Sequence, residues 1–528
     1  MNTSIQRKGG VVLSYISIMI NTIVQLLFTP FLIRTLGQSE YGLYSLVASI
    51  ISYLTVLDLG FGNALIVYTS KYREQGKIEE EKKLHGMFRI VFVIIGLVAA
   101  LISIILHLNV DNIFGSTMTN YELNKMKIMT IILAVNLMMT FSFSIYSSII
   151  SAYEEFIFQK IISIIGTILK PILMLPILLL GYKSISMTLI LTICNIIVLI
   201  SNYLFCVNKL KIKIKFNGFD KKLFKVILGY SIWIFLSAIV DKINWSVDNF
   251  VLGAVSGTIA VSIYSIAATL NQMFVSLSTA ISGVLLPKMS KLVANNASGE
   301  ILTNEMIKVG RLQGYIIFLM CSGLILFGKE FIMFWAGANF EESYYVALLL
   351  IVPLCVPLIQ NLGLSIMQAM NKYKFKSIST AIMAIFNLII SIFLAKRWGA
   401  IGAAFGTCCS LIICNIIIIN IYYYKSLHIN VLDFWKSIFK QIMPLFIPII
   451  ITIIIKNFLY YDTVFCLTLY VLLYSICYAI IAYTMSMNDY EKKTVKNILK
   501  VFVKKVNHGT NNWKEQVLWM PCMFKYMS

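Results

Sequence analysis

Polar side chains inside long apolar segments are the residues of this chain whose types and spacing could do chemistry. In the segment 227–251, four residues at positions i, i+3, i+4 and i+7 share one helical face: Asp241, Asn244, Trp245 and Asp248. Ionisable groups inside a membrane are costly and typically mark an aqueous cavity or an ion path. Asp241 and Asp248 are therefore candidates to carry a proton or Na⁺. Asn244, Trp245 and the adjacent Lys242 are candidates to contact a substrate. The alternative is that Asp241 and Lys242 only neutralise partners on a neighbouring helix.

A third intramembrane carboxylate, Asp58, lies between apolar residues and is followed by Gly60 and Gly62. Two glycines close to a carboxylate predict a locally opened helix whose freed backbone groups line a cavity. Asp58 is therefore also a candidate for ion coupling. Pairing with a helix N–H group or a lysine is the structural alternative.

A cation stands at the centre of the segment 158–180, where Lys170 precedes Pro171. Proline has no N–H group and disturbs the preceding helical turn, so we expect a kink at this position. A buried ammonium at the membrane midplane requires an anion, which could be a phosphate of the substrate or one of the aspartates already named. Extension of the side chain to the interface is a third interpretation. Lys170 is thus a candidate substrate-binding residue.

Three further cations, Arg34, Lys288 and Arg311, lie at the ends of apolar segments. Basic residues at such positions commonly anchor the topology. The alternative for each is that it attracts an anionic ligand into the mouth of a cavity, and we keep Arg34 and Arg311 as candidates for this role.

The elements that must position these residues are membrane-spanning helices. Hydrophobic residues make up 59% of the chain and charged residues 13%, whereas soluble domains have about 45–50% and 25%. A span needs about 20 mostly apolar residues. Fourteen segments meet this requirement: 10–33, 43–69, 87–108, 128–150, 158–180, 185–207, 227–251, 258–286, 312–328, 346–368, 377–395, 400–424, 437–455 and 463–485.

The distribution of basic residues supports this topology. Most of the 44 Lys and Arg fall in every second gap between the spans, and cytoplasmic loops carry such an excess. We therefore expect a multi-pass protein of the cytoplasmic membrane with both termini inside. The net charge of +21 requires no nucleic acid, because basic loops next to spans contact anionic lipids.

Short motifs recur at a nearly constant offset, which indicates an internal repeat. Leu36-Gly37 corresponds to Leu252-Gly253, the sequence at 151–153 to that at 368–370, and Leu180-Gly181 to Trp398-Gly399. Six spans separate the two members of each pair. Because six is an even number, the two halves have the same orientation, as in transporters with parallel repeats. We expect an N-terminal lobe of six spans in 1–214, a C-terminal lobe of six spans in 215–430, and two additional helices with a basic cytoplasmic tail in 431–528.

The sequence offers little to an enzyme. It contains no Walker lysine loop, no HExxH motif, and no gap between spans long enough for a catalytic domain. The ten Cys show no metal-ligand spacing, and we interpret them as small packing residues. We expect no cofactor and no metal site.

Several motifs together resemble the Wzx-type polysaccharide flippases of the multidrug/oligosaccharidyl-lipid/polysaccharide exporter superfamily. They occur in order over most of the chain: Phe31-Leu32-Ile33-Arg34-Thr35-Leu36-Gly37, Tyr41-Gly42-Leu43-Tyr44, Leu57-Asp58-Leu59-Gly60-Phe61, Asp248 with Leu252-Gly253 and Tyr264, Leu286-Pro287-Lys288-Met289-Ser290, and Trp398-Gly399-Ala400-Ile401-Gly402-Ala403-Ala404.

The resemblance implies two six-helix bundles forming a V around a central cavity, with two extra C-terminal helices. It also implies that the protein flips undecaprenyl-pyrophosphate-linked oligosaccharide repeat units from the inner to the outer leaflet of a bacterial cytoplasmic membrane. These units would serve the synthesis of O-antigen, capsule or a teichuronic-type polymer. A polysaccharide polymerase and glycosyltransferases are possible partners.

Three alternatives remain at this stage. A multidrug cation antiporter of the same superfamily shares the twelve-helix core, although it usually stops at twelve spans. A membrane glycan polymerase or glycosyltransferase would be expected to have a large outward loop with catalytic carboxylate or arginine motifs. A scaffold for glycan assembly that transports nothing is the third.

Overall fold

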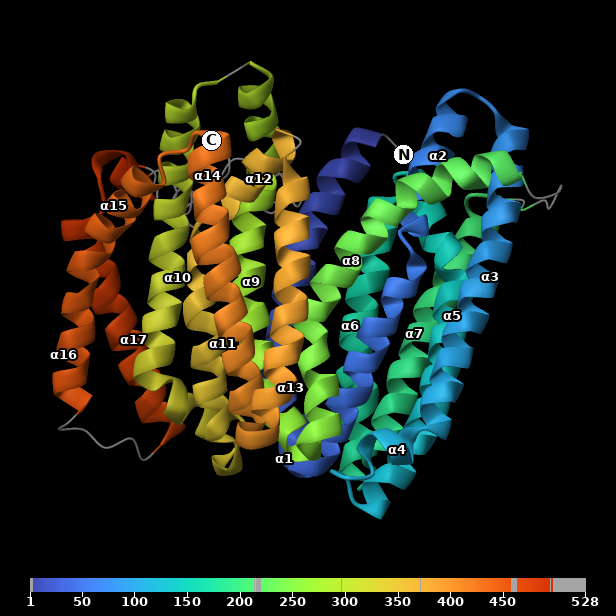
Figure 1. The fold of residues 1–528 in the computed structure, drawn as a ribbon, viewed down its shortest axis with the longest axis horizontal. Coiled ribbons are helices and arrows are strands. Elements are labelled where there is room, and N and C mark those ends of the chain that lie inside the picture. Colours follow the sequence, from blue (N-terminus) through green and yellow to red (C-terminus); the bar gives the residue numbers. More distant parts are fainter. Residues whose placement is uncertain are drawn as a thin grey trace, which may run out of the picture. The chain divides into compact units, whose positions relative to one another are not determined.

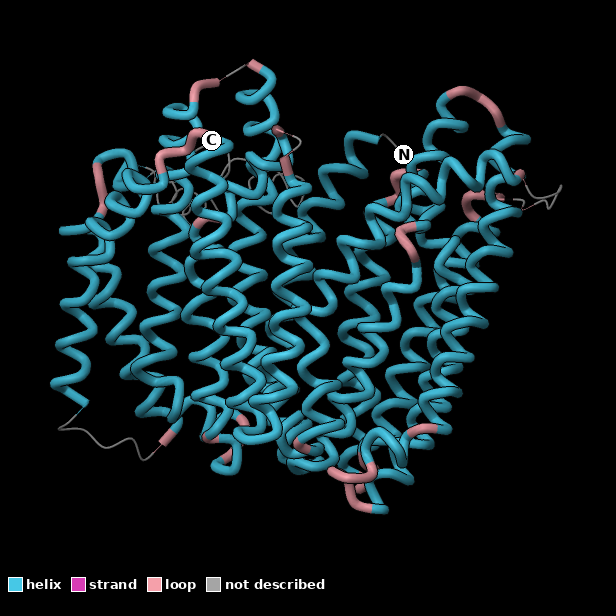
Figure 2. The backbone as a smooth tube through the Cα atoms, in the orientation of Figure 1, coloured by secondary structure: helices cyan, strands magenta, loops and turns pink. Residues whose placement is uncertain are grey.

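A computed structural model describes residues 3–212, 214, 220–295, 297–370, 372–456, 463–493 and 495–496. All regular secondary structure in these residues is helical (Figure 2). Eleven helical stretches of the described residues are long and apolar enough to cross a membrane. The expected class, an all-α integral membrane protein, is therefore confirmed.

The helices are numbered along the chain as in Figure 1. Their bounds are α1 (Thr3–Leu54), η1 (Thr55–Asp58), α2 (Phe61–Glu74), α3 (Ile78–Leu108), α4 (Val110–Phe114), α5 (Asn120–Ala152), α6 (Phe156–Leu179), α7 (Ser184–Asn208), α8 (Lys221–Val255), α9 (Gly257–Ala294), α10 (Gly299–Trp335), η2 (Ala338–Phe340), α11 (Glu342–Ile359), α12 (Asn361–Ala369), α13 (Tyr373–Leu411), η3 (Ile412–Ile418), α14 (Ile419–Leu427), α15 (Val431–Ile442), η4 (Met443–Leu445), α16 (Phe446–Lys456), α17 (Val464–Ile481) and η5 (Ala482–Ser486).

Two of the long helices each contain a break in their backbone geometry. In α1 the break is at Gly37, whose φ of 77° and ψ of 173° are not helical. In α13 it is at Trp398 and at Gly399, whose φ is 53°. Each break falls between two predicted spans. The two spans on either side of a break therefore belong to one helical stretch and are counted once among the eleven. The number fourteen stays a prediction.

The first compact unit comprises Met1–Ser265 and Ala384–Gly406. Within it α5 packs against α3 and α7, and α1 packs against α6 and α8; α3, α5 and α7 run side by side in Figure 1. Phe61 and Phe88 are almost completely buried, and their rings meet edge to face at 5.9 Å. Aromatic contacts of this type hold α2 against α3.

Hydrogen bonds to a buried carboxylate tie three helices together in the first unit, close to the break in α1. Glu122 of α5 accepts hydrogen bonds from Ser39 of α1 at 2.5 Å and from Thr258 of α9 at 2.6 Å. Glu122 also completes a capping box with Thr119 at the start of α5. Hydrogen bonds to a charged acceptor are stronger than neutral ones, so this end of the unit is firmly held.

The second compact unit comprises the described residues of Ile266–Met383 and Thr407–Ser528. In this unit α10 packs against α11, α15 and α17. Its core contains Tyr315, Phe327, Tyr474 and Tyr478. The sequence-based domains 1–214, 215–430 and 431–528, the parallel repeat and the V arrangement stay predictions.

Candidate functional site

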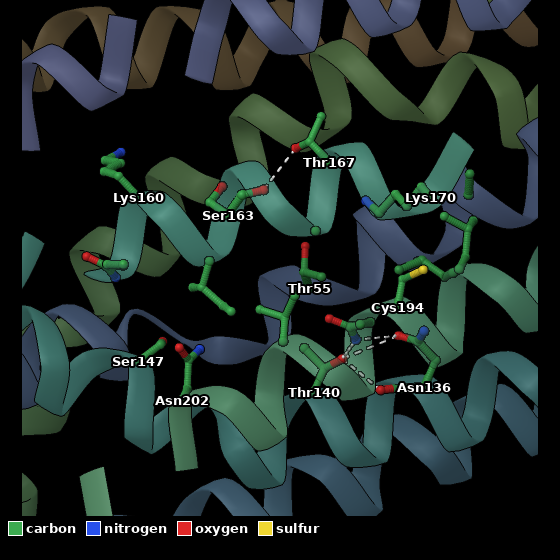
Figure 3. A pocket seen from close by; sticks show the side chains of 18 residues that line it. Thr55, Asn136, Thr140, Ser147, Lys160, Ser163, Thr167, Lys170, Cys194 and Asn202 are labelled. Carbon is green, nitrogen blue, oxygen red and sulfur yellow. Dashed lines mark hydrogen bonds between the residues drawn. The ribbon is translucent and has the colours of Figure 1, made fainter. Parts of the chain in front are cut away.

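A cavity of about 680 Å³ lies within the first unit, between α1, α5, α6 and α7. Hydroxyl, amide and lysine side chains line its walls (Figure 3). None of the described residues that line it is Asp or Glu, whereas two are lysines, Lys160 and Lys170. The cavity therefore combines positive charge with many neutral hydrogen-bonding groups.

One wall of the cavity is a polar face of α6. Lys160, Ser163, Thr167 and Lys170 follow one another at intervals of three and four residues, which places them on one side of the helix. Figure 3 shows the two lysines at opposite ends of this face, with Ser163 and Thr167 between them. Ten residues of helix correspond to a rise of about 15 Å. In this conformation the two lysines therefore face different parts of the cavity.

The opposite wall is formed by α5 and α7, which are joined by amide and hydroxyl side chains. Asn136 donates to Thr192 at 3.0 Å. Asn195 donates to Asn136 at 3.2 Å and to Thr140 at 2.6 Å. Because these groups satisfy one another, this part of the wall is held in a fixed arrangement.

The structure places Lys170 at the end of the cavity that also contains Cys194 (Figure 3). The expected helix disturbance does not interrupt α6, which continues through Pro171, although the proline cannot donate to the carbonyl of Thr167. Within the part of the chain that the structure describes, neither Lys170 nor Lys160 forms a hydrogen bond or an ion pair. The ammonium of Lys170 can thus meet a ligand in the cavity.

Asp58 lies at an opened turn of the chain, as its sequence predicted. The short helix η1 ends at Asp58. The next two residues have positive φ, 54° at Leu59 and 72° at Gly60, and α2 begins at Phe61. The carboxylate accepts a hydrogen bond from the backbone N–H of Gly62 at 3.3 Å. Asp58 is not among the residues that line the cavity described above, so the structure does not bring it together with Lys170 in that cavity.

The polar residues of α8 divide between two neighbouring helices. Lys242 donates to Ser52 of α1 at 2.6 Å, and Asn249 donates to Ser49 of α1 at 2.7 Å. Asp248 is 2% exposed and accepts a hydrogen bond from Tyr264 of α9. The side chains of the other candidates on this helix lie outside the described residues: Asp241, Asn244 and Trp245.

The two arginine candidates lie in different surroundings. Arg34 is exposed, three residues before the break in α1. Arg311 belongs to α10 in the second unit and is buried, where it donates to both carboxylate oxygens of Glu491 at 2.5 and 2.9 Å. It also donates to the carbonyl of Ser486 at 3.0 Å. An anionic ligand could bind Arg311 only by displacing a bidentate carboxylate.

Lys160 and the amides of Asn136, Asn195 and Asn202 were not predicted as site residues, because the clearest signals in the sequence are ionisable groups at the centres of spans. The spacing of Lys160, Ser163, Thr167 and Lys170 on α6 was the signal that could have found this wall. Nothing in the sequence indicated which faces of α5 and α7 it would meet.

Comparisons with known proteins agree with this architecture. The model of a family described as "Polysaccharide biosynthesis protein" matches residues 8–293. A Shigella flexneri protein named "Putative O-antigen transporter" is 22% identical over 407 residues, which cover 73% of this chain and 90% of the relative.

Solved structures of transporters share the fold. A structure of the lipid II flippase MurJ in an inward closed conformation matches with a TM-score of 0.72 and 19% identity, covering 90% of this chain and 97% of the other. An inward-facing multidrug resistance transporter of the MATE family, in the MOP superfamily, matches with a TM-score of 0.61 and 14% identity, covering 77% and 96%. These relatives are named as transporters and flippases rather than as enzymes.

The motifs at 31–37, 41–44 and 57–61 and the one at Asp248 lie inside the matched residues, so the resemblance inferred from the sequence is confirmed at the level of the family. Because the match extends over more than half of the sequence, this multi-pass membrane protein belongs to the polysaccharide biosynthesis protein family.

Proposed function

We propose that this protein flips oligosaccharides linked to undecaprenyl pyrophosphate from the inner to the outer leaflet of a bacterial cytoplasmic membrane. The observation that carries the proposal is the cavity of the first unit, which has two lysines, many hydroxyl and amide groups, and no carboxylate among its described lining residues. The names of an O-antigen transporter and a lipid II flippase among its relatives support the same substrate class.

The physical task of such a protein is to carry a charged, hydrated headgroup past the hydrocarbon core. The lipid tail can remain in the bilayer, whereas burying an unpaired charge in hydrocarbon is prohibitively costly. A polar cavity replaces water around the headgroup, and alternating access changes the side to which the cavity opens. In this proposal Lys170 binds the pyrophosphate, and the neutral polar walls solvate the sugars.

The cavity argues against the transport of cations, the activity of the alternative multidrug antiporter. A cationic substrate would meet two ammonium groups and no counter-charge among the described lining residues. At a separation of 4 Å, two like charges repel by about 4 kcal/mol at an effective dielectric constant of 20. An anionic headgroup would instead be attracted by the same two ammonium groups.

Several finer features belong to the proposal. Both termini lie on the cytoplasmic side, and an H⁺ or Na⁺ gradient drives the cycle through Asp58, Asp241 or Asp248. A polymerase and glycosyltransferases act with the flippase in the same assembly. The excess of basic residues in alternate gaps of the sequence supports the orientation.

Replacement of Lys170 tests the proposal directly. In vesicles containing undecaprenyl-pyrophosphate-linked oligosaccharide, we expect Lys170→Ala to reduce translocation at least tenfold, because it removes the cation that binds the pyrophosphate. Lys170→Arg should retain part of the activity, since arginine also binds phosphate. The measurement is the fraction of glycan that becomes accessible to a lectin on the opposite leaflet.

Lys183→Ala is the matched control, because Lys183 is an exposed lysine outside the cavity lining. Normal translocation by Lys170→Ala at equal protein abundance would contradict the assigned role. Transport of amphiphilic cations by the wild-type protein, with no movement of glycolipid, would favour the antiporter.

A further inference from the structure

Asn202 of α7 differs from the other amides of the cavity. It lines the cavity yet is only 6% exposed, and its Oδ1 atom has no hydrogen-bond partner among the described residues. Figure 3 shows it beside Ser147 at the end of the cavity that contains Lys160 and Ser163. A buried carbonyl without a partner is unusual, because almost all buried polar groups in folded proteins are hydrogen-bonded.

The amides at the other end of the cavity are satisfied by protein partners. Asn136 and Asn195 form hydrogen bonds with each other and with the hydroxyls of Thr192 and Thr140. Among the described residues that line the cavity, Lys170 is the cation at this end, which is shown on the right of Figure 3. The cavity thus has one end with Lys170 and a fixed wall, and another end with Lys160 and an amide oxygen that has no partner among the described residues.

The amide of Asn202 can turn toward a ligand at little cost. Its carbonyl oxygen is screened from solvent in this conformation, but the terminal torsion of asparagine has a broad, roughly two-fold energy profile. Rotation about this torsion breaks no hydrogen bond of Oδ1, and it exchanges the positions of the oxygen and the NH₂ group. A donor group entering the cavity would then relieve the unpaired carbonyl.

We infer that Asn202 is a sugar-binding residue whose amide accepts a hydrogen bond from the glycan while Lys170 holds the pyrophosphate. The inference rests on the proposed function and deepens it by dividing the cavity into a phosphate end and a glycan end. Asn195 and Asn202 are seven residues apart on α7, or about 10.5 Å of helix rise. This separation places Asn202 beside a sugar of the attached chain rather than beside the phosphates. The donor is a sugar hydroxyl or the N–H of an acetamido group.

The experiment measures the binding of three lipids to the purified full-length protein in nanodiscs. They are undecaprenyl pyrophosphate and its cellobiosyl and N,N′-diacetylchitobiosyl derivatives. The two attached disaccharides differ in that chitobiose has acetamido groups where cellobiose has hydroxyls. We expect the wild-type protein to bind at least one glycolipid more tightly than the bare lipid. Leucine is similar in size to asparagine but has no polar group. Asn202→Leu should therefore weaken binding of the preferred glycolipid by about tenfold and leave the affinity for the bare lipid unchanged.

Stability provides a readout that does not depend on activity. Removing an unpaired buried carbonyl should raise the melting temperature of the ligand-free Asn202→Leu protein or leave it unchanged. Asn202→Ala is the second variant, because it removes the amide without adding branched volume. Asn208→Leu, an exposed position on the same helix outside the cavity lining, is the matched control.

The outcomes separate the inference from the function on which it rests. If Asn202→Leu weakens binding of the chitobiosyl lipid alone, the donor is an acetamido group. If it weakens binding of both glycolipids, the donor is a hydroxyl. An unchanged preference in both Asn202 variants, or an equal loss for all three lipids, would overturn the sugar-binding role. Failure of the wild-type protein to bind any of the three lipids would instead overturn the proposed function.

Discussion

Asp248 is a buried carboxylate that accepts a hydrogen bond from a neutral phenol, the hydroxyl of Tyr264. Asparagine at this position keeps the shape and an acceptor oxygen but removes the charge. The sequence alone indicated that Asp248 faces the interior, because a carboxylate facing lipid would cost about 2.5–3.5 kcal/mol even on a lenient scale. It could not indicate that Tyr264, sixteen residues along the chain, would be the group it meets.

We expect Asp248→Asn to slow gradient-driven translocation severalfold in proteoliposomes and to alter its pH dependence. The loss of stability should be only about 1 kcal/mol, the difference between a charged and a neutral hydrogen bond. Tyr264→Phe is the companion variant, because it removes the hydrogen bond but keeps the carboxylate. If Asp248→Asn left both the rate and the pH profile of transport unchanged, Asp248 would have a structural role only.

At the scale of helices, the apolar runs of the sequence predicted where most elements lie, and the breaks at Gly37 and Gly399 fall in two of the gaps between predicted spans. Gly37 combines a φ of 77° with a ψ of 173°, and Gly399 combines a φ of 53° with a ψ of −131°, which are conformations that residues with a side chain rarely adopt. What the sequence could not indicate is the rotation of each helix about its axis. Lys242 and Asn249 contact α1 through two serines, and this pairing depends on packing between segments distant in sequence.

Close packing of α1 against α9 gives a prediction for Gly42. A Cβ atom at this position would lie 2.0 Å from the backbone carbonyl oxygen of Thr258, and backbone cannot move aside as a flexible side chain can. We expect Gly42→Ala to destabilise the protein by about 1–3 kcal/mol, as overpacking generally does. Thermal unfolding followed by loss of monodisperse protein in detergent measures the effect.

Gly323→Ala is the control for the glycine prediction. Gly323 lies inside α10, and an added Cβ would meet nothing within 4 Å. Because alanine favours helix by up to about 1 kcal/mol over glycine, this variant should be neutral or slightly stabilising. Equal stability of the two variants would show that α1 and α9 can separate without cost.

At the scale of the whole chain, Arg311 and Glu491 join residues far apart in sequence within the second unit. Their side chains are 9% and 2% exposed, and Glu491 also accepts from the backbone N–H of Asn488 at 2.9 Å. The pair therefore fastens the segment after η5 to α10. From the sequence, Arg311 was expected to be a membrane anchor or a ligand-binding residue, because Glu491 lies beyond the last predicted span and its sequence context does not indicate burial.

We expect Glu491→Ala to destabilise the protein by about 3–5 kcal/mol, because it leaves the buried guanidinium without a counter-charge. The measurement is the melting temperature of the purified full-length protein. Glu79→Ala is the control, because it removes an exposed pair with Lys82 that contributes at most about 1 kcal/mol. A melting temperature as high as that of the control would show that solvent reaches Arg311 in place of Glu491.

The candidate site was predictable in part, for reasons of physics. Lys170 could be identified because a charge in the middle of an apolar segment is costly anywhere except at an interior site. Lys160 and Asn202 could not, because a lysine near the end of a span and a neutral amide within one are common in packed helices. Only the assembly of α5, α6 and α7 gives these residues a common cavity.

The positive cavity has a consequence for the protein between transport cycles. Two ammonium groups that face water without a carboxylate among the described lining residues attract mobile counter-ions from solution, as any uncompensated charge does. We therefore expect chloride and inorganic phosphate to bind there, and, in the proposed function, each arriving pyrophosphate headgroup to exchange with them. We expect the apparent affinity of this cavity for an anionic headgroup to decrease as the salt concentration of the medium rises.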